Sequence, residues 1–164
     1  MKRIITLFTI IALWSCSTQK NSFESEPVST KVFLNNPFGF TETTENFSSN
    51  ANLKFDVKKV AQENKHYPNQ TDTIYTLTYR KSEITIYKSH TGKEFLLAGK
   101  IADKKMKLSN SIRIGMNKNE FLNRFTDHLD NKDNRVQIID EGTKYTFIFK
   151  KEKLAQIDID NYFD

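Results

Sequence analysis

The stretch that decides the fold is Thr73-Ile74-Tyr75-Thr76-Leu77-Thr78-Tyr79. Its side chains alternate, with Ile74, Thr76 and Thr78 on one side of an extended chain and Tyr75, Leu77 and Tyr79 on the other. Strict alternation of this kind predicts a β-strand that is covered on one face. Turns at 80–82 and 90–92 separate it from strands expected at 83–88, with Ile84 and Ile86 inward, and at 94–102. Three strands joined by short turns predict an antiparallel meander.

A second meander is expected near the C-terminal end. Strands are predicted at 136–139, 144–150 and 154–159, with turns at 141–142 and 151–152. Alternation places six residues on one face of the last two strands, and these are expected to form the core of this half: Tyr145, Phe147, Phe149, Ala155, Ile157 and Ile159. The stretch 53–57 also alternates like a strand, whereas 57–63 is compatible with a strand or a helix.

A short helix is expected before each meander. Thr41 is a candidate N-cap for a helix that runs to about residue 48. Asn117 is the better N-cap, since Glu120 completes the spacing of a capping box and Met116 and Phe121 that of a hydrophobic staple. The second helix would carry on one face Phe121, Leu122, Phe125 and Leu129. Residues 32–34, followed by Pro37, are interpreted as a short first strand.

These elements predict an α+β fold in which an antiparallel sheet has short helices on one face. At 164 residues, with 13 Phe and 6 Tyr, the chain can bury one core, and we expect a single α+β domain at 32–164. Gly39 and Gly115 each precede a helix and three strands, so two tandem helix-plus-meander repeats, 32–108 and 109–164, are an open alternative.

The N-terminus has the layout of an export signal. Lys2 and Arg3 precede a mostly apolar run at 4–13, and small Ser15 precedes Cys16, the single cysteine of the chain. A helix over that run would be about 15 Å long, too short to cross a hydrocarbon core of about 30 Å. We therefore expect residues 1–15 to be a signal peptide; the alternative is a buried helix of the mature fold.

Leu13-Trp14-Ser15-Cys16 resembles the lipobox of bacterial lipoproteins, from which Trp14 departs because a smaller residue is usual there. The resemblance implies cleavage before Cys16, lipidation of its thiol and acylation of its new amino group, with palmitate-type chains. Two or more acyl chains anchor a protein stably to a bilayer. The alternative is ordinary secretion with Cys16 discarded or left as an odd thiol.

Residues 16–31 are polar and rich in Ser, Thr and Glu, which is typical of a flexible tether. A flexible segment of this length reaches roughly 20 Å. Glu24 and Glu26 come late, whereas lipoproteins displayed outside the cell carry acidic residues directly after the cysteine. We therefore expect the chain in the bacterial cell envelope, lipid-anchored to the outer membrane and facing the periplasm.

A second resemblance lies within the domain. Ile114-Gly115-Met116-Asn117-Lys118-Asn119-Glu120-Phe121, followed by a hairpin, is similar to a segment of the small lipoprotein subunit of the outer-membrane barrel assembly machine. The helix-plus-sheet unit also resembles the repeat of the β-lactamase inhibitor protein fold. The Gly-x-Pro turn of the assembly lipoprotein is replaced here by Arg124-Phe125-Thr126-Asp127, and no binding residue is carried over.

Composition argues against several classes of function. The chain has 25 Lys and Arg against 20 Asp and Glu, and loss of Lys2 and Arg3 with the signal leaves a mature net charge of about +3. The basic residues are scattered rather than gathered into a patch, so nucleic acid is not an expected partner. With Cys16 lipidated, no disulfide can form, and the domain must be stable through its core alone.

No set of polar residues predicts a catalytic, cofactor or metal site, and we expect no enzyme activity. Metal-ligand spacing is absent among His66, His90 and His128. The acidic loop at 127–134 lacks the order and closing Glu of a calcium loop, although it contains Asp127, Asp130, Asn131, Asp133 and Asn134. The C-terminal acids Asp158, Asp160 and Asp164 form an acidic edge, with Asp158 and Asp160 expected on a solvated sheet face. Nucleophile-elbow and phosphate-loop motifs do not occur in the chain.

The sequence thus predicts a membrane-anchored envelope lipoprotein with a non-catalytic protein-binding or structural α+β domain. Its expected partners are the lipid bilayer, through Cys16, and another envelope protein that contacts a face of the sheet. One alternative is an inhibitor or immunity-type lipoprotein that blocks an enzyme through the same face. Another is a small-ligand-binding lipoprotein that uses an aromatic lining between helix and sheet.

Overall fold

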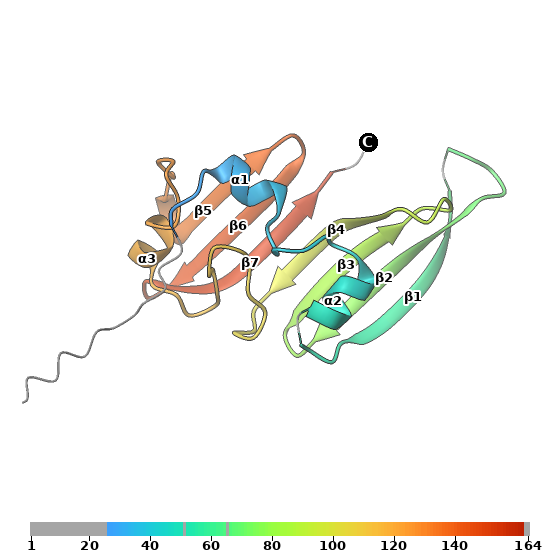
Figure 1. Ribbon diagram of the computed structural model, residues 1–164, viewed down its shortest axis with the longest axis horizontal. Coiled ribbons are helices and arrows are strands. Elements are labelled where there is room, and N and C mark those ends of the chain that lie inside the picture. Colours follow the sequence, from blue (N-terminus) through green and yellow to red (C-terminus); the bar gives the residue numbers. More distant parts are fainter. Residues whose placement is uncertain (1–25, 51, 65, 163–164) are drawn as a thin grey trace, which may run out of the picture.

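A computed structural model of the chain describes residues 26–50, 52–64 and 66–162, so the expected signal, Cys16 and most of the expected tether lie outside the described residues. The described part is built on a seven-stranded sheet in which every neighbouring pair is antiparallel (Figure 1). The strands are β1 Asp56–Glu63, β2 Thr71–Tyr79, β3 Ser82–Lys88, β4 Glu94–Ile101, β5 Arg135–Asp140, β6 Thr143–Lys150 and β7 Lys153–Asn161. The expected α+β class is confirmed.

Two meanders form this sheet, and they join through their last strands. The strand order is β1-β2-β3-β4-β7-β6-β5, so that β4 pairs with β7 in the middle. Gly99 lies opposite Ile159 at this junction, and a Cβ atom there would stand 3.0 Å from the Cδ1 atoms of Ile159 and Ile84. The absence of a side chain at Gly99 therefore lets isoleucines from both meanders fill one continuous core.

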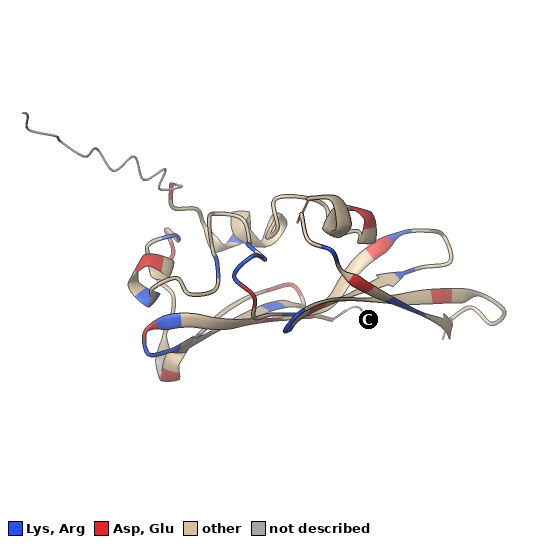
Figure 2. Cartoon of the chain, turned by 90° about the horizontal axis from the view of Figure 1, so that it is seen from below, with Lys and Arg blue, Asp and Glu red and all other residues tan. Residues whose placement is uncertain are grey.

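Short helices lie on one face of the sheet, as Figure 2 shows from the side. They are α1 Thr30–Asn35, α2 Thr44–Asn50 and α3 Lys118–Leu122, with a 3₁₀ turn η1 at Lys132–Asn134. In Figure 1, α1 lies over the C-terminal meander and α2 over the N-terminal one. The expected placement of the helices on one face is confirmed.

Aromatic side chains fill the space between helices and sheet. Phe33 of α1 packs edge-on against Phe125 and Tyr145, with ring centroids 5.5 and 5.6 Å away. Phe121 of α3 packs against Phe147 at 4.6 Å. All five rings are buried. Burial of each large apolar side chain is worth roughly 1.5–3 kcal/mol, so these contacts hold α1 and α3 on the sheet.

The segment 32–34 is helical rather than the strand expected from the sequence, because α1 is capped and anchored. Ser29 Oγ accepts a hydrogen bond from Val32 N at 3.2 Å, and Phe33 alone of the segment is buried deeply. Residues before the expected domain boundary at 32 also contact the domain. Val28 bridges to Phe125, and its N–H donates to Arg124 O at 3.0 Å.

The two predicted helices exist, but their bounds differ from the prediction. Helix α2 begins at Thr44 instead of after Thr41, because Thr43 provides the cap and accepts from Asn46 N at 3.2 Å. Asn117 caps α3 as predicted, and its Oδ1 accepts from Asn119 N at 2.9 Å. Helix α3 ends at Leu122, so the helical face predicted through 129 is wrong.

The early end of α3 has a tertiary cause. The carbonyl of Arg124 and the N–H of Thr126 both bond to the backbone of Val28, at 3.0 Å each. These groups are therefore unavailable to a longer helix. Phe125 and Leu129 are still buried, but they reach the core from an irregular segment.

The predicted strands are largely confirmed. The strand expected at 53–57 begins only at Asp56, and residues 57–63, for which strand and helix were both open, continue it in register with β2. One core position is also corrected. Ala155 is only partly buried, because a register shift pairs Ile148 with Gln156 and Phe149 with Leu154. Leu154 takes the core position expected for Ala155, as a β-bulge requires.

Candidate functional site

The side of the sheet opposite the helices is covered by no helix of the described residues (Figure 2). We call this side the open face, and two rows of cross-strand neighbours on it run through all seven strands. One row is Lys58, Thr76, Thr85, Ala98, Asp160, Lys144 and Ile139, and the next is Asp56, Thr78, Glu83, Lys100, Asp158, Thr146 and Gln137. These two rows are mostly polar and rich in threonine, whereas the next row on the same face of the N-terminal meander contains Val60, Ile74 and Tyr87.

The covered side of the same strands contrasts with the open face. A row between the two polar ones contains Leu77, Ile84, Ile159, Tyr145 and Ile138, all buried. This contrast follows from the two-residue period of a strand, which sends neighbouring side chains to opposite faces. The strict alternation in the sequence thus reflects one dry side and one accessible side.

Charges of both signs interleave on the open face. Lys144 Nζ lies 3.2 Å from Asp160 Oδ2, and Gln156 Nε2 donates to Asp158 Oδ1 at 2.7 Å. Hydrogen bonding to Asp160 raises the pKa of Lys144 and so favours its charged form. Mixed charges and hydroxyls of this kind are typical of the polar rim of protein interfaces.

A hollow of about 320 Å³ lies at the centre of the open face, over the junction of the meanders. Small residues form its floor, at Ala98 and Gly99, and longer polar residues surround them: Glu83, Thr85, Lys100, Asp158 and Asp160. The hollow gives an otherwise flat sheet face a place where a protruding side chain of a partner can enter.

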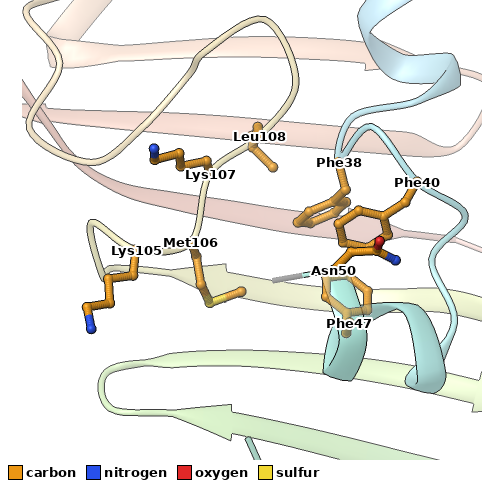
Figure 3. Close-up of a pocket in the computed structure, with 8 residues that line it drawn as sticks. All are labelled: Phe38, Phe40, Phe47, Asn50, Lys105, Met106, Lys107 and Leu108. Carbon is orange, nitrogen blue, oxygen red and sulfur yellow. The ribbon is translucent and has the colours of Figure 1, made fainter. Parts of the chain in front are cut away.

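An apolar pocket of about 330 Å³ lies on the helix side (Figure 3). We call it the aromatic pocket, and its lining is Phe38, Phe40, Phe47, Asn50, Lys105, Met106, Lys107 and Leu108. The three phenylalanine rings pack on one another with centroids 4.8–5.8 Å apart. They come from α2 and the linker before it, whereas Met106 and Leu108 come from the segment after β4 and face them across the pocket.

The two lysines of the aromatic pocket flank it rather than fill it. In Figure 3 the ammonium groups of Lys105 and Lys107 point away from the phenylalanine rings. Both side chains are exposed and carry flexible stems. The lining therefore combines an apolar interior with positive charge near its mouth.

Asp72, near the start of β2, is a buried carboxylate that the sequence did not single out. Asp72 accepts hydrogen bonds from Tyr87 Oη at 2.6 Å, Asn64 Nδ2 at 2.7 Å and His90 N at 2.8 Å. The hydrogen bond from Tyr87 is the largest cause of a lowered pKa of Asp72, and it raises the pKa of Tyr87 in turn. Because Asp72 joins three segments, the geometry gives it a structural role.

His66 and His90 both belong to the surroundings of Asp72 and Asn64. The ring of His90 is 3.8 Å from Asp72, and His66 N donates to Asn64 Oδ1 at 2.8 Å. His128 is exposed. Among the described residues, no group of three or more His, Cys, Asp or Glu is arranged to hold a metal ion.

The acidic residues of the 127–134 loop have local structural contacts. Asp127 accepts a hydrogen bond from Thr30 N, the first residue of α1, and this bond lowers the pKa of Asp127. Asp133 and Asn134 adopt positive φ angles of 51° and 58° in the 3₁₀ turn. Asp158 and Asp160 lie on the open face as expected, whereas Asp164 and Cys16 are outside the described residues.

Comparison with known proteins gives no significant match to a protein-family model, to a curated protein or to a solved structure. Within the described residues, the helices are too short and too polar for any of them to cross a bilayer.

Proposed function

We propose that this chain is a membrane-anchored envelope lipoprotein whose α+β domain binds another envelope protein through the open face, without catalysis. The observation that supports this function best is a face with two mostly polar rows that cross all seven strands, hollowed at its centre. The helices occupy the opposite side, so a partner can approach the open face without displacing the core.

The anchor in this proposal is Cys16, in the lipobox-like stretch Leu13-Trp14-Ser15-Cys16. Residues 16–31 would lead from the lipid to the domain, on the periplasmic side of the outer membrane. The proposal rests there on the sequence pattern and on the stability that two or more acyl chains give to a membrane anchor.

Pull-down from detergent-solubilised membranes tests the proposed partner. Ala98→Arg places a long charged side chain in the hollow of the open face, whereas Ser48→Arg makes the same change on exposed α2 and is the matched control. We expect Ala98→Arg to lower recovery of the partner by about tenfold, as changes at the centre of an interface do, and Ser48→Arg to leave it unchanged. Equal recovery with both variants would count against the open face.

The identity of the captured protein separates the alternatives. A barrel protein or a barrel-assembly subunit favours an assembly role, and a knockout strain with intact barrel proteins and an intact envelope would remove that role. An enzyme that copurifies tightly and loses activity favours the inhibitor or immunity-type alternative.

The aromatic pocket supports a second candidate, a small-ligand-binding lipoprotein. Its volume of about 330 Å³ is at the small end of the range for ligand sites, and its lining is mostly apolar. An acyl chain with an anionic head would match the phenylalanine rings and the flanking Lys105 and Lys107. Saturable binding of decanoate that is lost in Phe40→Ala would support this candidate, and no binding by the wild-type chain would dismiss it.

A further inference from the structure

A third hollow, of about 200 Å³, lies on the helix side, and its lining differs in character from that of the aromatic pocket. We call it the polar pocket. The linker between α1 and α2 contributes Thr41 and Glu42, the start of β4 contributes Glu94, and β6 and β7 contribute Thr143, Tyr145 and Asn161. With Leu34 and Asn35 of α1, five segments from three distant parts of the sequence therefore meet around one small cavity.

The charged side chains that line the polar pocket within the described residues are two carboxylates, with no Lys, Arg or His. Glu94 already has its counter-charge, because it accepts from Lys88 Nζ at 2.9 Å and from Thr44 N at 2.7 Å. Burial acts to raise the pKa of Glu94, but these hydrogen bonds outweigh it and the pKa is lowered. Glu94 is thus an ionised group with a structural contact on each oxygen.

Glu42 is in a different situation. Its side chain is partly buried, and it forms no ion pair with any Lys, Arg or His of the described residues. Burial raises the pKa of Glu42, and a hydrogen bond from its own backbone opposes that rise. Burial of a carboxylate without a nearby cation costs desolvation free energy, and a positive charge bound beside it would offset that cost.

Asn161 adds an acceptor to the same pocket. Its Nδ2 donates to Leu96 O at 2.7 Å, which fixes the direction of the side-chain amide. Its Oδ1 is buried and has no hydrogen-bond partner among the described residues. Since buried polar atoms normally find a partner, this oxygen would gain one if the amide turned toward the pocket and accepted an N–H from a bound molecule.

We propose that the polar pocket binds a small organic cation through its ammonium or guanidinium group, with Glu42 as counter-charge and Asn161 Oδ1 as a further acceptor. Such a group carries the two features that the pocket lacks, a positive charge and several N–H donors. The cation can be a free small amine or a basic side chain of a bound protein. The polar pocket lies on the helix side, so this site does not depend on the proposed use of the open face.

Titration of the full chain with n-butylammonium, followed by NMR, tests the site. We expect saturable shifts that centre on Glu42 and the side-chain amide of Asn161, and no saturable shifts there with butyrate or butanol. Glu42→Gln keeps the size of the side chain and removes its charge, and we expect at least about tenfold weaker binding. Glu45→Gln, on the exposed surface of α2 outside the pocket, is the matched control and should change affinity by less than about twofold.

A second titration with Nα-acetyl-lysine amide distinguishes the two sources of the cation. Tighter binding than n-butylammonium indicates a basic side chain of a partner, and weaker binding indicates a free amine; both results support the site. Absence of saturable binding by both cations, or equal affinity of wild type and Glu42→Gln, would overturn the proposal. The wild-type shift map decides the question even if Glu42→Gln does not fold.

Discussion

At the scale of single residues, the structure shows how three hydrogen-bonded carboxylates take fixed roles. Asp72 is held by three donors, Glu94 by a lysine and a backbone N–H, and Asp127 by the first backbone N–H of α1. Each carboxylate joins segments that are distant in sequence, and each has a lowered pKa. Glu42 departs from this pattern with a raised pKa, which is why it is the candidate for an external partner.

Asp72 leads to a prediction about pH. The folded-state pKa is lowered, chiefly by the hydrogen bond from Tyr87, so the stabilisation is present above the unfolded value of about 3.9 and is lost as pH falls through the folded value. We expect Asp72→Asn to lower the thermal unfolding midpoint at pH 7, and the gap to wild type to shrink below about pH 4. The control is Asp140→Asn, because the side chain of Asp140 in β5 is exposed. A gap that stays constant from pH 7 to pH 3 would contradict this role.

At the scale of elements, periodic patterns could predict strands better than helices. The alternation at 73–79 predicted β2, because a sheet with one dry face imposes that period on each strand. The helices are five to seven residues long, and tertiary contacts decide their ends. Backbone hydrogen bonds to Val28 end α3 early. The N-cap and the buried Phe33 make 30–35 helical in spite of its strand-like pattern. Neither contact can be recognised from the neighbouring sequence.

Phe33 is the main apolar anchor of helix α1, with partly buried Leu34 beside it. Phe33 is 1% exposed and touches Phe125, Tyr145 and Phe147, whereas the adjacent Val32 is 57% exposed. We expect Phe33→Ala to lower the free energy of unfolding by about 3–5 kcal/mol, because it leaves a cavity among aromatic rings. Val32→Ala should change it by less than about 0.5 kcal/mol. Urea denaturation of the two variants measures this, and similar values for both would show that α1 is not anchored through Phe33.

At the scale of the whole molecule, the sheet divides the domain into a helix side and an open face. The open face follows from the predicted alternation, so its residues could be predicted from the sequence. The pockets could not, because they form where distant segments meet. In the polar pocket, Glu42 of the α1–α2 linker meets Asn161 of β7. In the aromatic pocket, Phe47 of α2 meets Leu108 of the segment after β4.

The proposed anchor leads to a prediction at this scale. Cys16→Ser removes the thiol that would carry lipid, so the chain should move from the membrane to the soluble fraction. Its far-UV circular dichroism should match that of wild type, since Cys16 lies before the described domain. Cell fractionation with a salt wash measures the change. A variant that stays with the membrane after the wash would rule out the lipid anchor.

Site-specific photocrosslinking in intact cells tests the central claim most directly, because it records which side of the domain faces a partner. A photoreactive residue at Thr85 would project from the middle of the open face, and one at Ser48 from α2 on the other side. The account predicts a discrete crosslinked envelope protein from position 85 and none from position 48. Crosslinks from position 48 alone, or none from either position, would contradict it.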